Sequence, residues 1–281
     1  MCPYGSEGPF KIISRNTSSL ESRLDDVLDH PYDALALQEI EADEEAIKLI
    51  VKAAADAGAQ VRFSEITCIN KKSSRRFGRR AAILVRSKLP LIDLPIDPND
   101  TSTVELSASG RWVEVAIPTG DGNTHCILAN YYGVSGSSSN AADCLENSRY
   151  IGAAIIRQAQ FPDVPYFIAT DLNQDPTKSE VVSAATNLRY TYDIPAEWCD
   201  TAQPTFCRPK VYEGMTGSGC TRIDTILANR LGTTCVTDFN HCWHMGRDYD
   251  HVPLGLTLDF DAATATHHPI RPTLPSFSTF S

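Results

Sequence analysis

The sequence lacks several features that mark large classes of protein. None of its apolar runs approaches the roughly 18 residues that a membrane-spanning helix requires. Its first residues, 1–9, lack the apolar core of a secretory signal peptide. No segment recurs at a fixed interval of about 20–50 residues, which argues against a solenoid or propeller built from repeats. We therefore expect an intracellular protein of the nucleus or cytoplasm that is neither secreted nor bound to a membrane.

Cysteines at the spacing of a zinc site are also absent. The nine cysteines are scattered, odd in number and never arranged as Cys-x-x-Cys. The segment His241–His244 holds metal-capable side chains, but no second cysteine or histidine cluster completes a zinc site. Without a secretory signal, this pattern favours reduced thiols in a reducing compartment over a framework of disulfides.

Acidic residues outnumber basic ones, with one local exception. Thirty-five Asp and Glu against 25 Lys and Arg give a formal net charge of −10, which argues against unspecific binding of polyanions over the whole surface. The basic segment 71–80 precedes a predicted strand, and we expect it to form a loop tip that contacts phosphates. A solvated hairpin turn or a nuclear localisation signal would give the same pattern. The candidate substrate-binding residues are Lys71, Lys72, Arg75, Arg76, Arg79 and Arg80.

The length and composition are those of a globular protein with a substantial core. The chain has 281 residues, of which 42% are apolar and 21% charged. Short apolar runs alternate with amphipathic segments, a pattern typical of α/β folds. Helices are predicted over 42–57 and 141–159, and a third opens with a capping box at 177–180. Strands are predicted at 10–14, 33–37, 61–66, 81–85, 112–117, 125–129, 165–169, 223–227 and 254–258.

Each half of the chain runs from strands through a helix to further strands. We therefore expect an α/β fold of the four-layer sandwich type, in which two packed mixed β-sheets are flanked by helices. Residues 10–260 would form this domain, after an N-terminal extension over 1–9. The tail 261–281 is rich in Pro, Ser and Thr and is predicted to be disordered.

Several acidic residues lie at the ends of predicted apolar strands. Glu39 follows the second strand, Asp171 follows the strand 165–169, and Asp250 precedes the last strand. A carboxylate at the rim of an apolar core is costly to desolvate unless a cation pairs with it. Each could be an ordinary turn residue or helix cap, but several that converge would bind a hard divalent metal. Oxygen ligands without a Cys/His cluster favour Mg²⁺ or Mn²⁺.

Eight short motifs follow one another along nearly the whole chain. They are Ile13–Asn16, Leu37–Glu39, Ala81–Leu84, Asn130–Gly133, Thr170–Asn173, Pro204–Phe206, Arg222–Asp224 and Asp250–Pro253. In this order and at these intervals, the motifs resemble those of the endonuclease/exonuclease/phosphatase family. The resemblance extends from about residue 10 to about residue 260 and implies the four-layer sandwich of that family.

The resemblance implies a metal site. Glu39 matches the acidic metal ligand of the family, and Asn16 matches the asparagine beside it, near the metal and the scissile phosphate. Asp250 matches a second acid near the metal. Arg15 stands where the family commonly has an aromatic residue. The expected cofactor is therefore Mg²⁺ or Mn²⁺.

The resemblance also implies catalytic roles. Asp171 matches the acid that activates water or assists the leaving oxygen, and Asn173 matches its phosphate-fixing neighbour. Tyr132 matches a tyrosine whose hydroxyl contacts phosphate. His251 matches the histidine that stabilises developing charge, and Asp224 matches the aspartate that orients this histidine. Because a phosphodiester is already negatively charged, attack by hydroxide needs a metal together with cationic or hydrogen-bonding groups.

The motifs favour a nucleic acid as the substrate. Arg222–Asp224 resembles the nuclease branches, and Gly110–Trp112 with the loop 130–136 resembles retroelement endonucleases. The sequence therefore predicts a Mg²⁺-dependent phosphodiesterase that hydrolyses a nucleic-acid backbone, with DNA favoured over RNA and with cleavage of the endonuclease type. We infer no obligate protein partner. Two alternatives stay open: an enzyme acting on a small phosphate ester, which the acidic surface favours, and a catalytically silent nucleic-acid-binding module.

Overall fold

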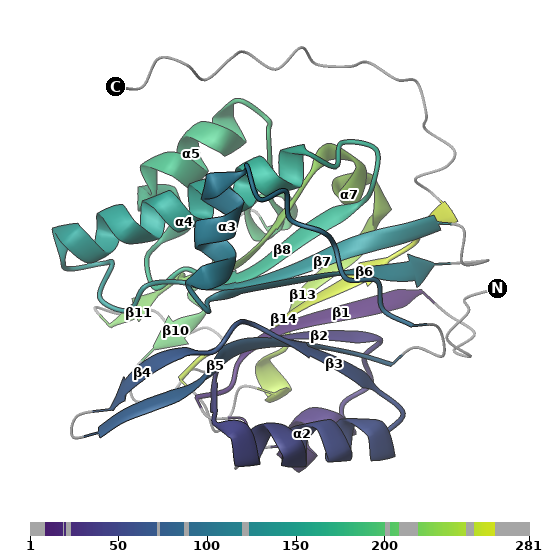
Figure 1. Cartoon of the computed structure of the whole chain (residues 1–281). Helices are drawn as coiled ribbons and strands as arrows, with labels where there is room; N and C mark the ends of the chain where they lie inside the picture. The colour runs from purple at the N-terminus through teal and green to yellow at the C-terminus, as the bar shows by residue number, and fades with distance from the viewer. Residues whose placement is uncertain are drawn as a thin grey trace.

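Two β-sheets pack face to face, and helices cover their outer faces (Figure 1). This arrangement, seen in a computed structural model, confirms the predicted four-layer α/β sandwich. The structure describes residues 9–18, 20, 24–71, 74–86, 90–119, 124–199, 203–207, 219–245 and 250–261. Within these ranges, no helix has both the length and the apolar character needed to cross a membrane. The predicted disordered tail lies outside the described residues from 262 onward.

The first sheet places strands from both ends of the chain side by side. β1 runs parallel to β2 and antiparallel to β14, so the earliest and latest strands meet in the middle of this sheet. In spatial order, the strands are β13 (Val236–His241), β14 (Leu254–Leu258), β1 (Phe10–Asn16), β2 (Ala34–Ala42), β5 (Ser74–Val85) and β3 (Gln60–Phe63), with β4 (Thr67–Lys71) also paired to β5.

The second sheet is built from the middle of the chain. In spatial order, its strands are β6 (Trp112–Thr119), β7 (Thr124–Tyr132), β8 (Tyr166–Asp171), β12 (Asp224–Ala228) and β9 (Tyr192–Asp193). β7 and β8 are parallel, whereas β12 is antiparallel to β8. In that antiparallel register, Asp224 stands opposite Asp171. A separate two-stranded sheet joins β10 (Phe206–Cys207) to β11 (Cys220–Thr221).

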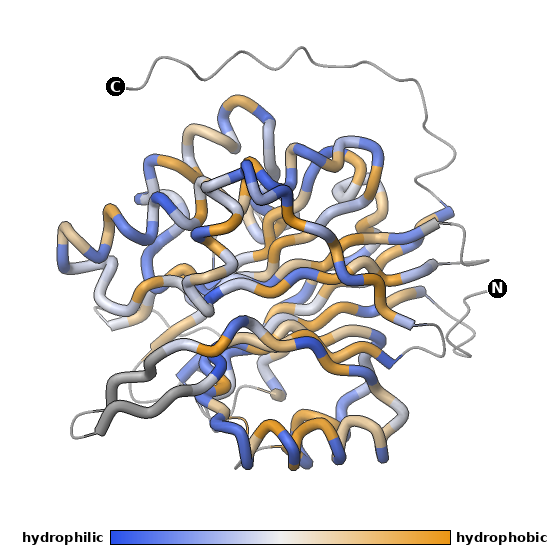
Figure 2. The backbone as a smooth tube through the Cα atoms, in the orientation of Figure 1, coloured by the Kyte–Doolittle hydropathy of each residue, from blue (hydrophilic) through white to orange (hydrophobic). Residues whose placement is uncertain are grey.

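Apolar side chains fill the space between the sheets and under the helices. Ile12 and Ile83 of the first sheet belong to the same buried cluster as Leu128 and Phe167 of the second. Hydrophobic residues recur along the strands of both sheets, whereas hydrophilic and hydrophobic residues alternate along the helices (Figure 2). Burial of this apolar surface is the main force that holds the sheets together.

Capping side chains fix where the helices begin. The side chain of Asp43 accepts a hydrogen bond from the Ala46 amide at the start of α2 (Glu44–Asp56), and Asn140 caps α4 (Ala141–Ala159) in the same way. The capping box expected at 177–180 is displaced, because Ser179 rather than Thr177 is the N-cap of α5 (Glu180–Asn187). The other helices are α1 (Leu24–Asp29), α3 (Thr101–Ala108), α6 (Ile194–Trp198) and α7 (Arg230–Cys235), with short 3₁₀ turns at Pro176–Lys178 and Trp243–Met245.

The basic segment 71–80 is not the loop tip that we predicted. Residues 74–80 form the first part of β5, which continues to Val85 as a single strand and pairs with β4. The predicted strand at 81–85 is therefore only the second half of β5. The resulting β4–β5 hairpin extends beyond the sandwich (Figure 1). Most of the described part of the basic segment thus lies along a hairpin strand.

The expectation that all cysteines are reduced is wrong for one pair. Cys207 and Cys220 stand opposite each other in the β10–β11 register, with their Cα atoms 4.3 Å apart, and they form a disulfide. Their spacing in the sequence gives no sign of this pairing, which depends on the register of β10 with β11. Free thiols occur at Cys126, Cys144, Cys235 and Cys242.

Candidate active site

The predicted catalytic residues gather at one edge of the two sheets. Because β1 and β2 are parallel, their carboxyl ends meet at the same edge and bring Asn16 close to Glu39. On the second sheet, β8 ends at Asp171, opposite the first residue of β12, Asp224. His251 precedes β14, and a bridge joins it to Phe206. Strand ends that are far apart in the sequence therefore supply one site.

One asparagine amide connects the acids of the two sheets. Nδ2 of Asn16 donates hydrogen bonds to Oε2 of Glu39 and to Oδ2 of Asp171, each at 2.9 Å. Oδ1 of Asn16 accepts a hydrogen bond from the Ser18 amide at 2.9 Å, which fixes the orientation of the side-chain amide. The structure thus brings Glu39, Asn16 and Asp171 together across the interface between the sheets.

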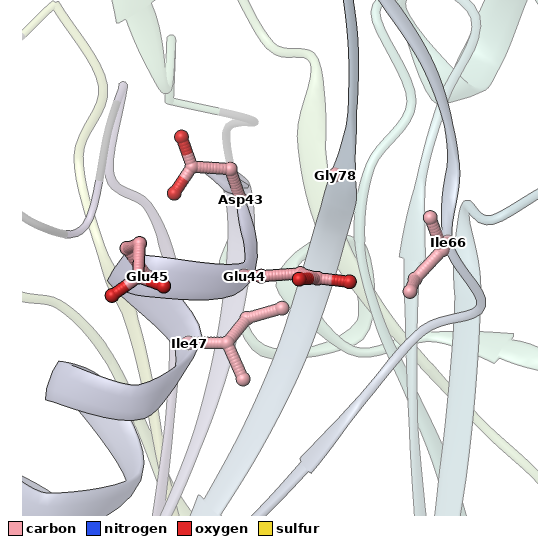
Figure 3. A pocket seen from close by; sticks show the side chains of 6 residues that line it. All are labelled: Asp43, Glu44, Glu45, Ile47, Ile66 and Gly78. Carbon is pink, nitrogen blue, oxygen red and sulfur yellow. The ribbon is translucent and has the colours of Figure 1, made fainter.

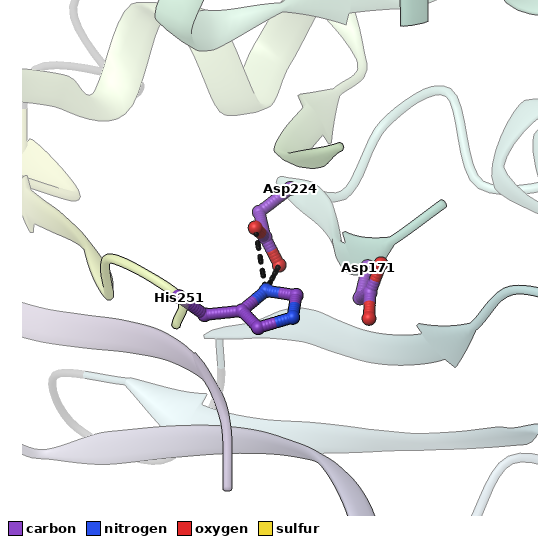
Figure 4. Close-up of side chains that lie close together, drawn as sticks. All are labelled: Asp171, Asp224 and His251. Atoms are coloured by element: carbon purple, nitrogen blue, oxygen red, sulfur yellow. Dashed lines mark hydrogen bonds and ion pairs between the residues drawn. The ribbon is translucent and has the colours of Figure 1, made fainter. Parts of the chain in front are cut away.

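Asp171, Asp224 and His251 form a tight buried cluster (Figure 4). A nitrogen or oxygen atom from each of the three side chains lies within 4.8 Å of the other two. Nδ1 of His251 lies 2.9 Å and 3.1 Å from the carboxylate oxygens of Asp224. This contact holds one ring nitrogen of the histidine and leaves the other pointing towards Asp171. The arrangement fits the orienting role that the sequence predicted for Asp224.

The electrostatics of this cluster raise the pKa values of both Asp171 and His251. The effect favours the neutral form of the acid and the charged form of the imidazole. Burial and the neighbouring Asp224 carboxylate raise the pKa of Asp171 to about 7. Burial alone would lower the pKa of His251, but Asp224, Asp171 and Asp250 together raise it to about 10. His251 is therefore a cation at neutral pH, whereas Asp171 can gain or lose a proton there.

Asn173 and Tyr132 lie beside Asp171 in the second sheet. The backbone amide of Asn173 donates to Oδ1 of Asp171 at 2.9 Å, and its side-chain amide donates to the Gly133 carbonyl at 3.1 Å. Tyr132 stands opposite Asp171 in the β7–β8 register, and its hydroxyl lies 3.2 Å from Oγ of Ser135. Burial, with the nearby Glu39 and Asp171 carboxylates, raises the pKa of Tyr132. Its hydroxyl therefore stays protonated and able to donate a hydrogen bond.

The acid-rich edge has the donor chemistry of a hard-metal site. Burial raises the pKa of Glu39, and the carboxylate of Asp250 raises it further, whereas the Asn16 amide lowers it. The Asp250 carboxylate also raises the pKa of His251, so it interacts electrostatically with both Glu39 and His251. The tightest cluster in the described part of the chain is nevertheless that of Asp171, and it does not include Glu39 or Asp250. Buried oxygen donors of this kind fit Mg²⁺ or Mn²⁺, whose charge would offset their desolvation.

A family comparison decides the class of protein to which this site belongs. Residues 16–244 match the model of the endonuclease/exonuclease/phosphatase family. The chain belongs to this family. The activities in the family name share the hydrolysis of phosphate esters, and the clustered acids and histidine are suited to that reaction. A search of curated proteins gave no match.

Several solved structures share the fold of this chain at low sequence identity. An AP endonuclease from Archaeoglobus fulgidus is 18% identical, with a TM-score of 0.63 over 89% of this chain and 99% of that one. A 3′ phosphatase, NExo, from Neisseria is 19% identical, with a TM-score of 0.61 over the same shares. The endonuclease domain of TRAS1, a telomere-specific non-LTR retrotransposon, is 14% identical, with a TM-score of 0.55 over 89% of this chain and 98% of that domain.

Two residues that the sequence left without a role support the site of this family member. Oγ1 of Thr205 accepts hydrogen bonds from the backbone amides of Ile223 at 3.0 Å and Asp224 at 2.9 Å. Nη1 of Arg111 donates to the carbonyls of Tyr132 and Gly133, at 3.2 Å and 2.6 Å. Both residues lie in segments that the motif comparison had singled out, but the motifs do not show which backbone groups they hold.

The structure describes the side chains of two of the six predicted phosphate-binding cations, Arg79 and Arg80. Arg79 donates to the Ser64 carbonyl and lies over the Phe63 ring, so its guanidinium supports the base of the hairpin. The backbone amide of Arg80 donates to Oγ of Ser64 at 3.2 Å, which ties this residue to the same part of the hairpin. The side chains of four candidate cations lie outside the described part of the structure: Lys71, Lys72, Arg75 and Arg76.

A surface groove at the base of this hairpin is separate from the catalytic cluster. It has a volume of about 280 Å³ and lies between the start of α2 and the hairpin (Figure 3). None of the candidate catalytic residues lines it. Its lining residues are Asp43, Glu44, Glu45, Ile47, Ile66 and Gly78.

Proposed function

We propose that this protein is a divalent-metal-dependent phosphodiesterase that hydrolyses a nucleic-acid backbone. The observation that carries this proposal is the buried Asp171–Asp224–His251 cluster, which Asn16 connects to Glu39. A cationic imidazole next to an acid of near-neutral pKa is suited to an anionic ester, because one group stabilises charge while the other transfers a proton.

The side chains of this site have complementary tasks in the proposed reaction. The oxygen of water attacks phosphorus, and the bond from phosphorus to the leaving oxygen breaks. Asp171 accepts the proton of the attacking water or passes a proton to the leaving oxygen, as its pKa of about 7 allows. His251, held by Asp224, donates a hydrogen bond to a phosphate oxygen as negative charge develops. Tyr132 and Asn173 contact the phosphate from the side of β7 and β8.

The proposed metal site consists of Glu39 with Asp250 and Asn16. A bound Mg²⁺ or Mn²⁺ would supply positive charge against the phosphate oxygens. Glu39 and Asp250 offer carboxylate oxygens, and the amide of Asn16 keeps Glu39 facing Asp171.

We further propose that the substrate is DNA, cut endonucleolytically as by a retroelement nuclease. The basic segment 71–80 supports a long polyanionic substrate, since it concentrates six cations on one hairpin of an otherwise acidic chain. The Neisseria structure is described as bound to a product DNA hairpin, and another relative is a retrotransposon endonuclease domain. These likenesses support DNA over RNA as the substrate.

Nicking of supercoiled plasmid tests this proposal directly. The wild-type protein should nick the plasmid with Mg²⁺ and not with EDTA. Glu39→Ala and His251→Ala should each reduce the rate by about 100-fold or more. Glu45→Gln, which removes an exposed charge from α2, serves as the control and should retain the wild-type rate. Absence of nicking by the wild type with any divalent metal would contradict the proposal.

A small phosphate ester is the second candidate substrate, because the chain is acidic outside the segment 71–80. Hydrolysis of bis(p-nitrophenyl) phosphate without nicking of plasmid would favour this candidate. Metal-independent DNA binding without cleavage of either compound would instead identify a binding module.

A further inference from the structure

Two buried amide side chains connect the sheets directly beneath the candidate metal site. Gln38 belongs to β2 of the first sheet, and Asn130 belongs to β7 of the second. Nε2 of Gln38 donates to Oδ1 of Asn130 at 2.7 Å and lies 3.1 Å from Oγ of Ser14. Both amides are 0% exposed. They therefore form a buried polar bridge between the sheets, beside the apolar cluster that fills most of the interface.

Asn130 also holds the backbone that precedes Glu39. Its Nδ2 atom donates to the carbonyls of Leu37 at 2.7 Å and Ala82 at 2.9 Å. These two residues face each other in the β2–β5 register. A single side chain from the second sheet thus fixes two adjoining strands of the first sheet, two residues before Glu39.

The bridge lies where β2 leaves its regular pairing. The β2–β5 register shifts between Gln38 and Ala42, and within this interval Glu39 and Glu41 have φ angles of 55° and 44°. Left-handed conformations are unfavourable for such residues and persist only where the surroundings impose them. The irregularity directs the Glu39 carboxylate towards Asn16. Gln38, which forms the bridge, is also the last residue of β2 in the regular register before the shift, where it pairs with Ala81.

The bridge has a cost that apolar side chains would not have. Buried amides must find hydrogen-bond partners, and the Oε1 atom of Gln38 has none among the described residues. Apolar residues such as Ala36 and Leu128 fill neighbouring positions between the same strands. Hydrophobic packing would therefore suffice to join the sheets here. The amides add directional hydrogen bonds, which fix the position of β2 relative to β7.

We propose that Gln38 and Asn130 are positioning residues that hold Glu39 in its left-handed conformation, facing Asn16 and Asp171. The catalytic consequence of this inference rests on the proposed function, because it acts through Glu39 as a metal ligand. Loss of the bridge should relax the end of β2, move the Glu39 carboxylate away from Asn16 and weaken binding of the divalent metal.

Gln38→Met is the informative variant, since methionine retains the length of the side chain and removes the donor. Two measurements test it: the NMR signal of the Asn16 side-chain amide, and the Mg²⁺ concentration that gives half-maximal nicking. We expect the Asn16 signal to shift and the Mg²⁺ requirement to rise by about tenfold or more. Ser14→Ala, which removes only one acceptor, should shift both in the same direction by less and serves if Gln38→Met does not fold.

Gln158→Met is the matched control. Gln158 is also 0% exposed, but its amide donates to the Tyr166 carbonyl under α4, on the outer side of the second sheet. It should lower the melting temperature without altering the Asn16 signal or the Mg²⁺ requirement. Equal changes in both variants, or a wild-type Asn16 signal in Gln38→Met, would overturn the inference. If the wild type does not nick DNA, the proposed function fails, and the Asn16 signal alone decides whether Gln38 positions Glu39.

Discussion

Two residues of the site have backbone conformations that only their surroundings explain. Glu39 and Asn173 have φ angles of 55° and 54°, in a region that non-glycine residues seldom enter. Glu39 lies in the irregular last part of β2, and Asn173 follows β8. Each places a polar group against Asn16 or Asp171. The sequence identifies both residues through short motifs. Their strain could not be predicted, because it arises from contacts with other strands.

Arg222 shows how a motif residue can serve the fold rather than the chemistry. Its guanidinium donates to both carboxylate oxygens of Asp193, at 3.0 Å and 2.7 Å, and the two side chains are only 4% and 10% exposed. We predict that Arg222→Met lowers the free energy of unfolding by about 3–5 kcal/mol, because it leaves the Asp193 charge buried without its partner. Urea denaturation measures this loss.

The double variant separates the ion pair from simple loss of packing. Arg222→Met combined with Asp193→Leu removes both charges, and we expect it to recover much of the stability lost by Arg222→Met alone. A double variant no more stable than the single one would contradict this account.

His241 makes stability depend on pH. Burial, followed by the charge of Arg222, lowers the pKa of His241 to about 4, and its ring packs against Phe239 and Trp243. Between pH 4 and 6.5 the unfolded chain binds more protons at this site than the folded one. Protonation of this histidine therefore favours the unfolded chain. The free energy of unfolding has its full value above about pH 6.5 and decreases as the pH falls towards 4.

His241→Phe should weaken that pH dependence. We expect the loss of unfolding free energy from about pH 7 to about pH 4.5 to be smaller in the variant by about 1 kcal/mol, a value reduced for partial solvent access. Urea denaturation at the two pH values gives the difference. Asp171 titrates in the same range in both proteins, so the comparison isolates His241. Equal slopes would show that His241 does not titrate as described.

At the scale of elements, strongly patterned segments were the predictable ones. The sequence predicted 141–159 and 254–258 with the bounds of α4 and β14. α4 has the Asn140 cap and a buried face at helical spacing. By contrast, α3 has only Thr103 and Leu106 buried, and β13 has only Val236 and Phe239. Such elements follow from tertiary packing, which local periodicity does not report.

The candidate site shows the same limit. Asn16, Glu39 and Asp171 are recognisable by motif because their chemistry requires those residue types. Their supporting contacts join residues with no common local pattern: Gln38 with Asn130, and Arg222 with Asp193. The types of the catalytic residues indicate the reaction. The side chains that hold them in place become neighbours only when the chain folds, so the sequence does not identify them.

The disulfide belongs to this group of unpredicted links. Cys207–Cys220 joins β10 to β11, and the neighbouring Phe206 ring lies 4.9 Å from that of His251. We predict that Cys207→Ser with Cys220→Ser lowers the free energy of unfolding by about 3 kcal/mol, through the greater freedom of the unfolded chain. Thermal denaturation with and without a dithiol reductant measures the effect.

The reductant provides the internal control for this prediction. It should lower the melting temperature of the wild type and expose two further reactive thiols, whereas the double serine variant should respond in neither respect. Cys144→Ser, at a free thiol of α4, should respond like the wild type. A wild type insensitive to the reductant, with no thiols gained, would contradict the disulfide.

At the scale of the whole molecule, the distribution of charge should govern how DNA is bound. The net charge of −10 disfavours a polyanion such as the proposed DNA substrate, whereas the segment 71–80 holds six cations and no acid. The hairpin that carries this segment projects beyond the sandwich (Figure 1). Binding should therefore depend on a few cations on one arm, and it should weaken steeply as salt screens them.

The triple variant Lys71→Ser, Arg75→Ser and Arg76→Ser tests this distribution. If each cation contacts one phosphate, the slope of log affinity against log salt should become shallower by about 3, because each contact contributes about 0.9. Fluorescence anisotropy with a labelled duplex in EDTA measures binding without cleavage. The control has the same net charge and replaces Lys48 and Lys52 of α2 and Arg230 of α7 by serine. If the hairpin cations contact the DNA, the control should keep the wild-type slope. Equal slopes in the two variants would mean that the affinity follows the net charge of the protein and not the hairpin.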